Sequence, residues 1–268
     1  MMPSLRGSLM TERPKTPEVR LEYMTSAAVL DGDFDKAILP IGATEFHGPH
    51  LPFGTDSIGA ETICEALARA LGKTLVLPTV TYGVSHNHMS FPWTVSVRPD
   101  TLMYLVRDIA ESLIANGIRK LIFVTAHDGN LPPAEGAARL LHQEHGISVA
   151  LMDGWQGRAR KALAGTQWDI DPDHGGQSEL SIVLYGAPET ARPELATAEP
   201  RQNMDVPVEV IGHFGDTVPK GYSGDGTAAS AEEGKAACQA LVDQVVPFLR
   251  ELEENGWKRG SFMSGISE

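Results

Sequence analysis

Short runs of apolar residues alternate with amphipathic segments along the first part of the chain. The runs are rich in aliphatic and β-branched residues, as buried strands are, and cover residues 37–41, 74–79, 120–125 and 148–152. Between them, apolar residues recur at helical spacing over residues 56–71, 98–116 and 132–145. This alternation predicts an α/β fold, a single domain with a mainly parallel central sheet covered by helices on both faces.

The second part of the chain is less regular. Helices are expected over residues 178–185 and 228–254, whereas residues 154–176 are expected to form loops and residues 189–226 show no clear periodicity. No repeat and no linker divides the chain. We therefore expect a flexible leader at residues 1–25, one α/β domain at residues 26–256 and a weakly ordered tail at residues 257–268.

Composition limits the classes of partner. Of the 268 residues, 42% are hydrophobic and 21% are charged, which excludes a disordered or collagen-like chain. The formal net charge of −13 opposes binding to nucleic-acid phosphates and to anionic membranes, so a small-molecule partner is expected. The chain shows neither a secretory signal nor an apolar run of about 18 residues, which predicts a cytoplasmic protein.

The segment after the first expected strand concentrates side chains that bind metals. It reads Gly-Ala-Thr-Glu-Phe-His-Gly-Pro-His over residues 42–50 and continues to Asp56. Glu45 and His47 point to the same side of an extended chain, and Asp56 returns at the start of the next helix. Imidazole and carboxylate groups are common ligands of divalent cations. In the alternative interpretation, Asp56 is a helix N-cap and Glu45 is a solvated loop residue.

Two later segments carry residues of the same chemistry. His127 follows the strand at 120–125 and is expected at the same edge of the sheet. His174 and Glu179 lie near the start of the helix expected at 178–185, where Glu179 could instead be only a favourable acid in the first helical turn. Three separate segments are thus predicted to bring metal-binding groups to one place.

These motifs resemble those of the creatininase family, the creatinine amidohydrolase-like metal hydrolases. The family pattern Gly-Ser/Ala-x-Glu-x-His-Gly-Pro-His-Leu-Pro, followed by Thr-Asp, is matched by residues 42–52 with Thr55 and Asp56. The Asn-Gly-His-Gly-Gly-Asn loop is matched loosely by residues 125–130, and the His-Ala-Gly-x-x-Glu-Thr-Ser stretch by residues 174–181. The resemblance spans roughly residues 38–234.

The resemblance implies two divalent metal ions per subunit, with zinc as the first choice and manganese or iron as alternatives. It implies that Asp56 bridges the two ions. Glu45 and His127 would bind one ion, and His47 and Glu179 would bind the other. A hydroxide that bridges the ions would then hydrolyse a small cyclic or linear amide.

The expulsion of an amine requires a proton carrier near the metals. We assign catalytic roles to His174 and Glu179, with His174 as the proton carrier; the alternative for His174 is a structural role in its glycine-rich turn. His88, Trp93 and Asp128 are expected to line the substrate pocket.

One residue departs from the pattern of creatininase itself. Gly129 stands where that enzyme has a metal-binding glutamate, which puts creatinine in doubt as the substrate. The missing carboxylate must then come from Glu179, or from Asp128 if the loop turns differently.

Two other functions stay open. The same metal site could hydrolyse a cyclic ester or a cyclic polyol ketone, for which no strong proton donor to an amine is needed. From a different class, the chain could be an inactive, metal-stabilised scaffold. The resemblance also implies a homo-oligomer, commonly a hexamer with active sites near subunit contacts.

Overall fold

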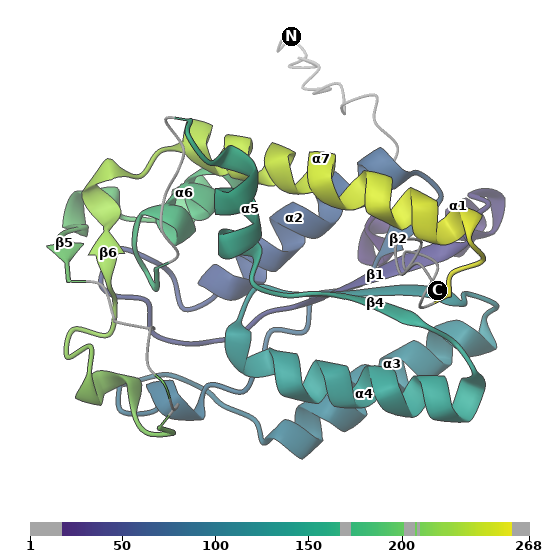
Figure 1. Cartoon of the computed structure of the whole chain (residues 1–268), viewed down its shortest axis with the longest axis horizontal. Helices are drawn as coiled ribbons and strands as arrows, with labels where there is room; N and C mark the ends of the chain where they lie inside the picture. Colours follow the sequence, from purple (N-terminus) through teal and green to yellow (C-terminus); the bar gives the residue numbers. More distant parts are fainter. Residues whose placement is uncertain (1–17, 167–172, 201–206, 208–209, 259–268) are drawn as a thin grey trace, which may run out of the picture.

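The computed structural model describes residues 18–166, 173–200, 207 and 210–258. Its centre is a parallel sheet with the strand order β2-β1-β3-β4 (Figure 1). The strands are β1 (Lys36–Ile41), β2 (Thr74–Val76), β3 (Lys120–Thr125) and β4 (Val149–Met152). The register pairs Ile41 with Thr125, so the carboxyl ends of β1 and β3 lie side by side. The expected parallel α/β sheet is confirmed.

Helices cover both faces of this sheet (Figure 1). One face carries α2 (Thr55–Leu71), α5 (Trp155–Leu163), α6 (Gln177–Gly186) and α7 (Ala231–Glu254). The other face carries α3 (Pro99–Ala115) and α4 (Leu131–His145). A short helix, α1 (Ser26–Asp31), precedes β1, and a small antiparallel ribbon joins β5 (Ala198–Glu199) to β6 (Gly224–Asp225).

The central strands are apolar on both sides because each side faces a separate core. Ile38 and Ile122 pack with the α2 and α7 side chains, whereas Leu39 and Phe123 pack with those of α3 and α4. Side chains alternate across a strand, so burial of both faces requires an unbroken apolar run. This double burial explains why the strands are visible in the sequence as continuous runs.

Local chemistry sets several helix ends. Pro99 begins α3, where its missing N–H costs nothing, and Gly146 ends α4 in the left-handed conformation. Ser230 caps α7 by accepting a hydrogen bond from the Glu233 N–H.

Two expectations for secondary structure are wrong. The strand expected at residues 74–79 ends at Val76, shortly before Pro78, which has no N–H for a ladder. Residues 154–176, expected to be loops, contain the helix α5. Gly157 inside the helix, with Gly154 and Gly165 beside it, weakens the helical pattern, but Trp155 and Ala159 are buried against the core and stabilise the helix by packing.

The packed region extends past residues 26 and 256 on both sides. Val19 is buried, and its carbonyl accepts a hydrogen bond from the Val76 N–H. Trp257 is also buried, and its indole Nε1 donates to the Ser148 carbonyl at 2.9 Å. Most of the expected leader and tail lies outside the described residues. Among the helices of the described residues, none has the length and apolar character that crossing a bilayer requires.

An ion cluster joins the amino-terminal edge of the sheet to the last turn of α7. The buried Lys36 donates to Asp35 at 2.7 Å and to Glu253 at 3.1 Å. Lys120 donates to the same two carboxylates. The hydrogen bond from Lys120 holds the pKa of Glu253 below its usual value.

We expect Glu253→Gln to lower the free energy of unfolding at pH 7 by about 0.5–1 kcal/mol, because solvent screens this partly exposed pair. A carboxylate with a lowered pKa stabilises the fold above its unfolded pKa of about 4.3 and loses this contribution as pH falls through the folded value. The difference between parent and variant should therefore shrink below pH 4. Urea unfolding at pH 7 and pH 3.5 measures it, with the exposed neighbour Glu254→Gln as the control. An equal difference at both pH values would contradict the assignment.

Candidate metal centre

The segment between β1 and α2 carries three buried polar side chains to the carboxyl edge of the sheet. Glu45, His47 and Asp56 are each almost fully buried. Asp56 is the second residue of α2, and Gly54 occupies the N-cap position. The alternatives of a solvated Glu45 and an N-capping Asp56 are therefore wrong.

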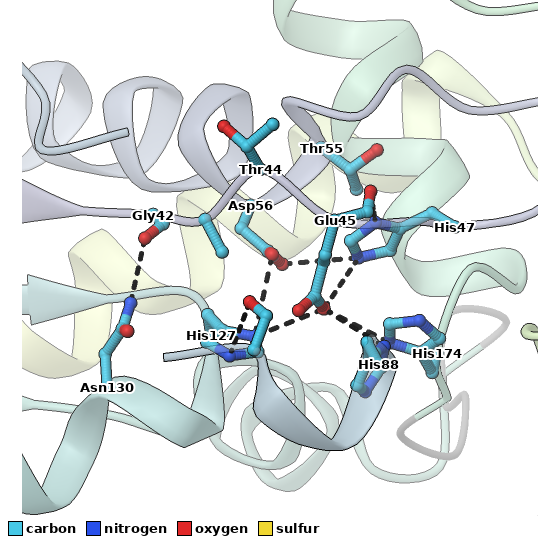
Figure 2. Close-up of polar contacts among 12 residues, drawn as sticks. Gly42, Thr44, Glu45, His47, Thr55, Asp56, His88, His127, Asn130 and His174 are labelled. Atoms are coloured by element: carbon cyan, nitrogen blue, oxygen red, sulfur yellow. Dashed lines mark hydrogen bonds and ion pairs between the residues drawn. The ribbon is translucent and has the colours of Figure 1, made fainter. Parts of the chain in front are cut away.

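His127 reaches the same place from the end of β3. Its Nδ1 lies 3.2 Å from Glu45 Oε1 and 3.6 Å from Asp56 Oδ2 (Figure 2). Its Nε2 donates to the Val84 carbonyl at 2.9 Å. Because a carbonyl only accepts hydrogen bonds, this contact leaves the Nδ1 lone pair of the neutral ring facing the two carboxylates.

His47 lies on the other side of Asp56. Its Nε2 is 3.4 Å from Asp56 Oδ1 and 3.4 Å from Oε2 of Glu179, which is in the first turn of α6. Its Nδ1 donates to the Glu45 carbonyl at 3.1 Å, so the Nε2 lone pair faces the carboxylates. Asp56 thus turns one oxygen toward His127 and the other toward His47, as a carboxylate that bridges two cations does.

The side chains form overlapping groups whose possible ligand atoms lie within 4.8 Å of one another. We call Glu45, Asp56 and His127 the first ligand group, and His47, His174 and Glu179 the second. At metal–ligand distances of about 2.0–2.1 Å, neighbouring ligands of a tetrahedral site lie about 3.3–3.4 Å apart. The separations of 3.2–3.6 Å around His127 and 3.4 Å around His47 agree with this spacing.

Several buried atoms at the centre lack a hydrogen-bond partner among the described residues. They are Glu45 Oε2, His47 Nε2, Asp56 Oδ2 and His88 Nδ1. A buried polar atom without a partner costs about 1–3 kcal/mol, and more if it is charged. Lone pairs of carboxylate and imidazole groups that converge on one point are satisfied by a cation. The residues present therefore fit divalent metal ions.

The electrostatics of the cluster also favour positive charge. Burial opposes protonation of His47, but Asp56 and Glu179 outweigh it and raise the pKa of His47 to about 10. Burial likewise opposes protonation of His127, and Glu45 outweighs it to raise the pKa to about 10. Burial raises the pKa of Glu179 to about 8. The carboxylates therefore attract positive charge, in the form of protons or of metal ions.

His174 and His88 complete the wall of the centre. The His174 Nε2 donates to the Phe46 carbonyl at 3.1 Å, and its ring stacks on His47 with the centroids 4.3 Å apart. His88, which we expected in the pocket wall, is buried with its Nδ1 3.6 Å from Glu45 Oε1 (Figure 2). Its ring stacks on Phe214. His88 therefore reaches the ligand cluster itself.

The other expected pocket residues lie apart from the cluster. Trp93 is 82% exposed and has a positive φ of 66°, which is unusual for a bulky residue. Asp128 is exposed, and the ligand groups found among the described residues do not include it. Of the two carboxylates considered for the second ion, Glu179 is thus the one whose oxygen faces His47.

Gly129 has no room for a side chain. A Cβ atom there would lie 2.2 Å from the Val84 carbonyl oxygen and 2.6 Å from His127 Nε2. These two atoms form the hydrogen bond that orients His127. The absence of a glutamate at this position therefore has a steric reason in this chain.

Two residues with structural influence on the centre escaped the sequence analysis. Asn130 accepts from the Val84 N–H and donates to the Gly42 carbonyl, both at 2.9 Å, and so joins the ends of β1 and β3 to the loop at 83–85. Gln156 donates to Glu179 from α5. Asn130 is the last residue of a recognised motif and could have been found, but Gln156 lies in a segment expected to be a loop.

Comparison with known proteins agrees with this geometry. Residues 22–249 match the family model described as "Creatininase: Creatinine amidohydrolase". The chain is 31% identical to the mycofactocin precursor peptide peptidase of Mycobacterium ulcerans over 233 residues, 83% of this chain and 87% of the relative. It is 28% identical to the 3-dehydro-scyllo-inosose hydrolase of Thermotoga maritima, over 82% and 78% of the two chains. It is 27% identical to the creatinine amidohydrolase of Pseudomonas putida, over 80% and 88%.

Solved structures show the same fold. A putative creatinine amidohydrolase from Bacteroides fragilis superposes with a TM-score of 0.74 at 26% identity, over 88% of this chain and 96% of the other. A structure named "Creatininase Mn" superposes with a TM-score of 0.71 at 26% identity, over 88% and 98%. On the strength of the family match, the sequence relatives and the shared fold, the chain belongs to the creatininase family and is a hydrolase.

Proposed function

We propose that the protein is a dinuclear metal-dependent amidohydrolase that cleaves a small cyclic or linear amide. The observation that carries this proposal is the placement of Asp56, whose two oxygens face two different histidines. Glu45 and His127 would hold one ion with Asp56, and His47 and Glu179 would hold the other. When bound, such a pair of ions polarises a carbonyl group and lowers the pKa of water so that water attacks at neutral pH.

The donor set suits several metals. Mixed imidazole and carboxylate ligands bind zinc, manganese and iron, and geometry alone does not separate them. We propose zinc first, with manganese or iron as alternatives. A solved relative whose name includes manganese supports the second choice.

The chain's own residues position the reactants and move the proton. The Phe46 carbonyl takes the Nε2–H of His174, so the Nδ1 of the neutral ring is free to accept a proton and pass it to the leaving nitrogen. Burial, reinforced by His47 and His88, holds the pKa of His174 well below its usual value, which favours the neutral ring. Glu179 contributes as a ligand beside this proton carrier.

The substrate class is broader than creatinine. The steric exclusion of a side chain at Gly129 argues against the ligand arrangement of creatininase itself. The likeness to the inosose hydrolase favours a second candidate function, hydrolysis of a cyclic ester or cyclic polyol ketone on the same metal site. Membership in a family of hydrolases argues against the inactive scaffold. A small-molecule substrate, a cytoplasmic location and a homo-oligomer such as a hexamer stay predictions.

Metal content tests the dinuclear site. We expect about two divalent ions per chain in protein purified without added metal or chelator, because two ligand groups share Asp56. Asp56→Ala should lose both ions and all hydrolysis. Elemental mass spectrometry measures the content, with Asp243→Ala, a surface change on α7, as the control. Full metal content and turnover in Asp56→Ala would overturn the proposal.

Removal of the proton carrier distinguishes the two candidate reactions. We expect His174→Ala to keep its fold and to lower kcat on an amide about 10²–10⁴-fold, because general acid catalysis contributes an effect of this size. On a cyclic ester or polyol ketone the loss should be much smaller. Steady-state rates on amides, formamides and lactones measure this, with the exposed His86→Ala as the control. An unchanged rate on a substrate amide would favour the second candidate function.

Substitution of Gly129 tests the support of His127. In Gly129→Ala the methyl group should displace Val84 or His127 and so misorient Nδ1. We expect the affinity of the first ligand group for metal to fall at least about tenfold. Competition with a chromophoric chelator measures the affinity, and Gly157→Ala, where the added Cβ meets nothing within 4 Å, is the matched control. Equal affinity in both variants would show that His127 does not need this contact.

A further inference from the structure

One side-chain amide on α5 connects two parts of the centre. Gln156 Nε2 donates to Glu179 Oε1 at 2.8 Å, and Gln156 Oε1 accepts from the Asp173 N–H at 2.7 Å. The first contact holds a carboxylate of the second ligand group. The second holds the residue directly before His174. Gln156 therefore connects Glu179 with the residue before His174 through one planar amide group.

The carboxylate of Glu179 is held at both oxygens. Gln156 occupies Oε1, and the Gly175 N–H donates to Oε2 at 2.7 Å. This second oxygen is the one that lies 3.4 Å from His47 Nε2. Because Oε1 is tied to α5, the carboxylate cannot rotate Oε2 away from His47 without breaking the Gln156 hydrogen bond.

Asp173, directly before His174, is held by the same amide. Asp173 accepts from Ser178 through Oδ1, at 2.7 Å from the hydroxyl, and through Oδ2, at 3.2 Å from the N–H. This joins the loop to the first turn of α6. The His174 carbonyl in turn accepts from the Ser223 N–H at 2.7 Å. Gln156 joins Asp173 to α5 by accepting a hydrogen bond from the Asp173 N–H.

These two hydrogen bonds restrict which side chain can stand at position 156. It requires a donor toward Glu179 and an acceptor toward the Asp173 N–H on one short planar group, which a primary amide provides. A glutamate would keep the acceptor but place a like charge against Glu179. A methionine of similar size would keep neither hydrogen bond.

We propose that Gln156 is a positioning residue that orients Glu179 as a metal ligand and so sets the metal affinity of the second ligand group. It acts through Glu179 and contacts neither metal nor substrate. This inference rests on the proposed dinuclear function. Hydrogen bonds to metal-binding side chains typically change metal affinity about 10–100-fold when they are lost.

Stepwise metal titration tests the proposal. Metal-free parent, Gln156→Met and Gln156→Glu are titrated with Zn²⁺ against a chromophoric chelator to obtain two dissociation constants. We expect one constant to weaken about 10–100-fold in both variants and the other to change less than about threefold. Gln239→Met is the matched control, because Gln239 donates to Asp243 at 2.8 Å on the exposed side of α7.

A double-mutant cycle assigns the affected ion. In a His47→Ala background, which lacks one of the two imidazoles of the second ligand group, Gln156→Met should leave the affinity for the remaining ion unchanged. Thermal unfolding of the metal-free variants distinguishes a purely structural effect from an effect on metal affinity. Lower melting temperatures with both dissociation constants unchanged would overturn the proposal, and so would equal weakening of both constants or failure of both variants to fold.

The same titration distinguishes a failure of the proposed dinuclear function from a failure of the role proposed for Gln156. A parent chain that binds fewer than two ions would refute the dinuclear site itself, and the role of Gln156 would fall with it. A parent that binds two ions, beside Gln156 variants that bind both equally well, would refute the role of Gln156 alone.

Discussion

The parallel pairing of β1 with β3 places the segment that carries Glu45 and His47 beside the one that carries His127. The ladder ends with Ile41 beside Thr125, and the Ala126 N–H continues it by donating to the Ile41 carbonyl. Beyond this point both chains leave the sheet at the same edge, so segments more than eighty residues apart in sequence converge. Asn130 extends the connection by one more hydrogen bond, to the Gly42 carbonyl. A shift of one residue in this register would turn alternate side chains to the opposite face.

Burial of acidic groups is the second constraint. Glu45, Asp56 and Glu179 are nearly inaccessible to solvent; all three lie within 4 Å of His47, and Glu45 and Asp56 lie within 4 Å of His127. Without a cation, repulsion and lost hydration oppose such an arrangement. The surrounding histidines are held by backbone carbonyls, which direct their lone pairs inward. Backbone groups thus orient these rings, and a cation that binds only the folded chain would stabilise the fold.

Sequence patterns predicted the parts of this protein that depend on local periodicity or on contiguous motifs. The strand at 120–125 was predicted to the residue because burial on both faces makes it continuously apolar. Glu45, His47 and Asp56 were recognisable because one short segment contains them. The helix α5 was missed, since Gly157 and three charged residues interrupt its apolar pattern and its stability comes from contacts of Trp155 with distant elements.

The missed features share a physical cause. The inward direction of His88 depends on a single turn of 3₁₀ helix at His86–His88, which apolar spacing does not reveal. The role proposed for Gln156 depends on contacts among α5, Asp173 and α6, which are separate in the sequence. No pattern in the residues next to Gln156 indicates these contacts. Side-chain contacts between segments are decided by packing, after the elements have formed.

The crowding around Gly129 also bears on how ligand sets diverge within the family. The Val84 carbonyl occupies the space that the first carbon of any side chain at residue 129 would need. A glutamate ligand therefore cannot appear there by one substitution while the loop at 83–85 keeps its path. The residue that position 129 accepts in this chain is thus decided by the backbone of a segment more than forty residues earlier in the sequence.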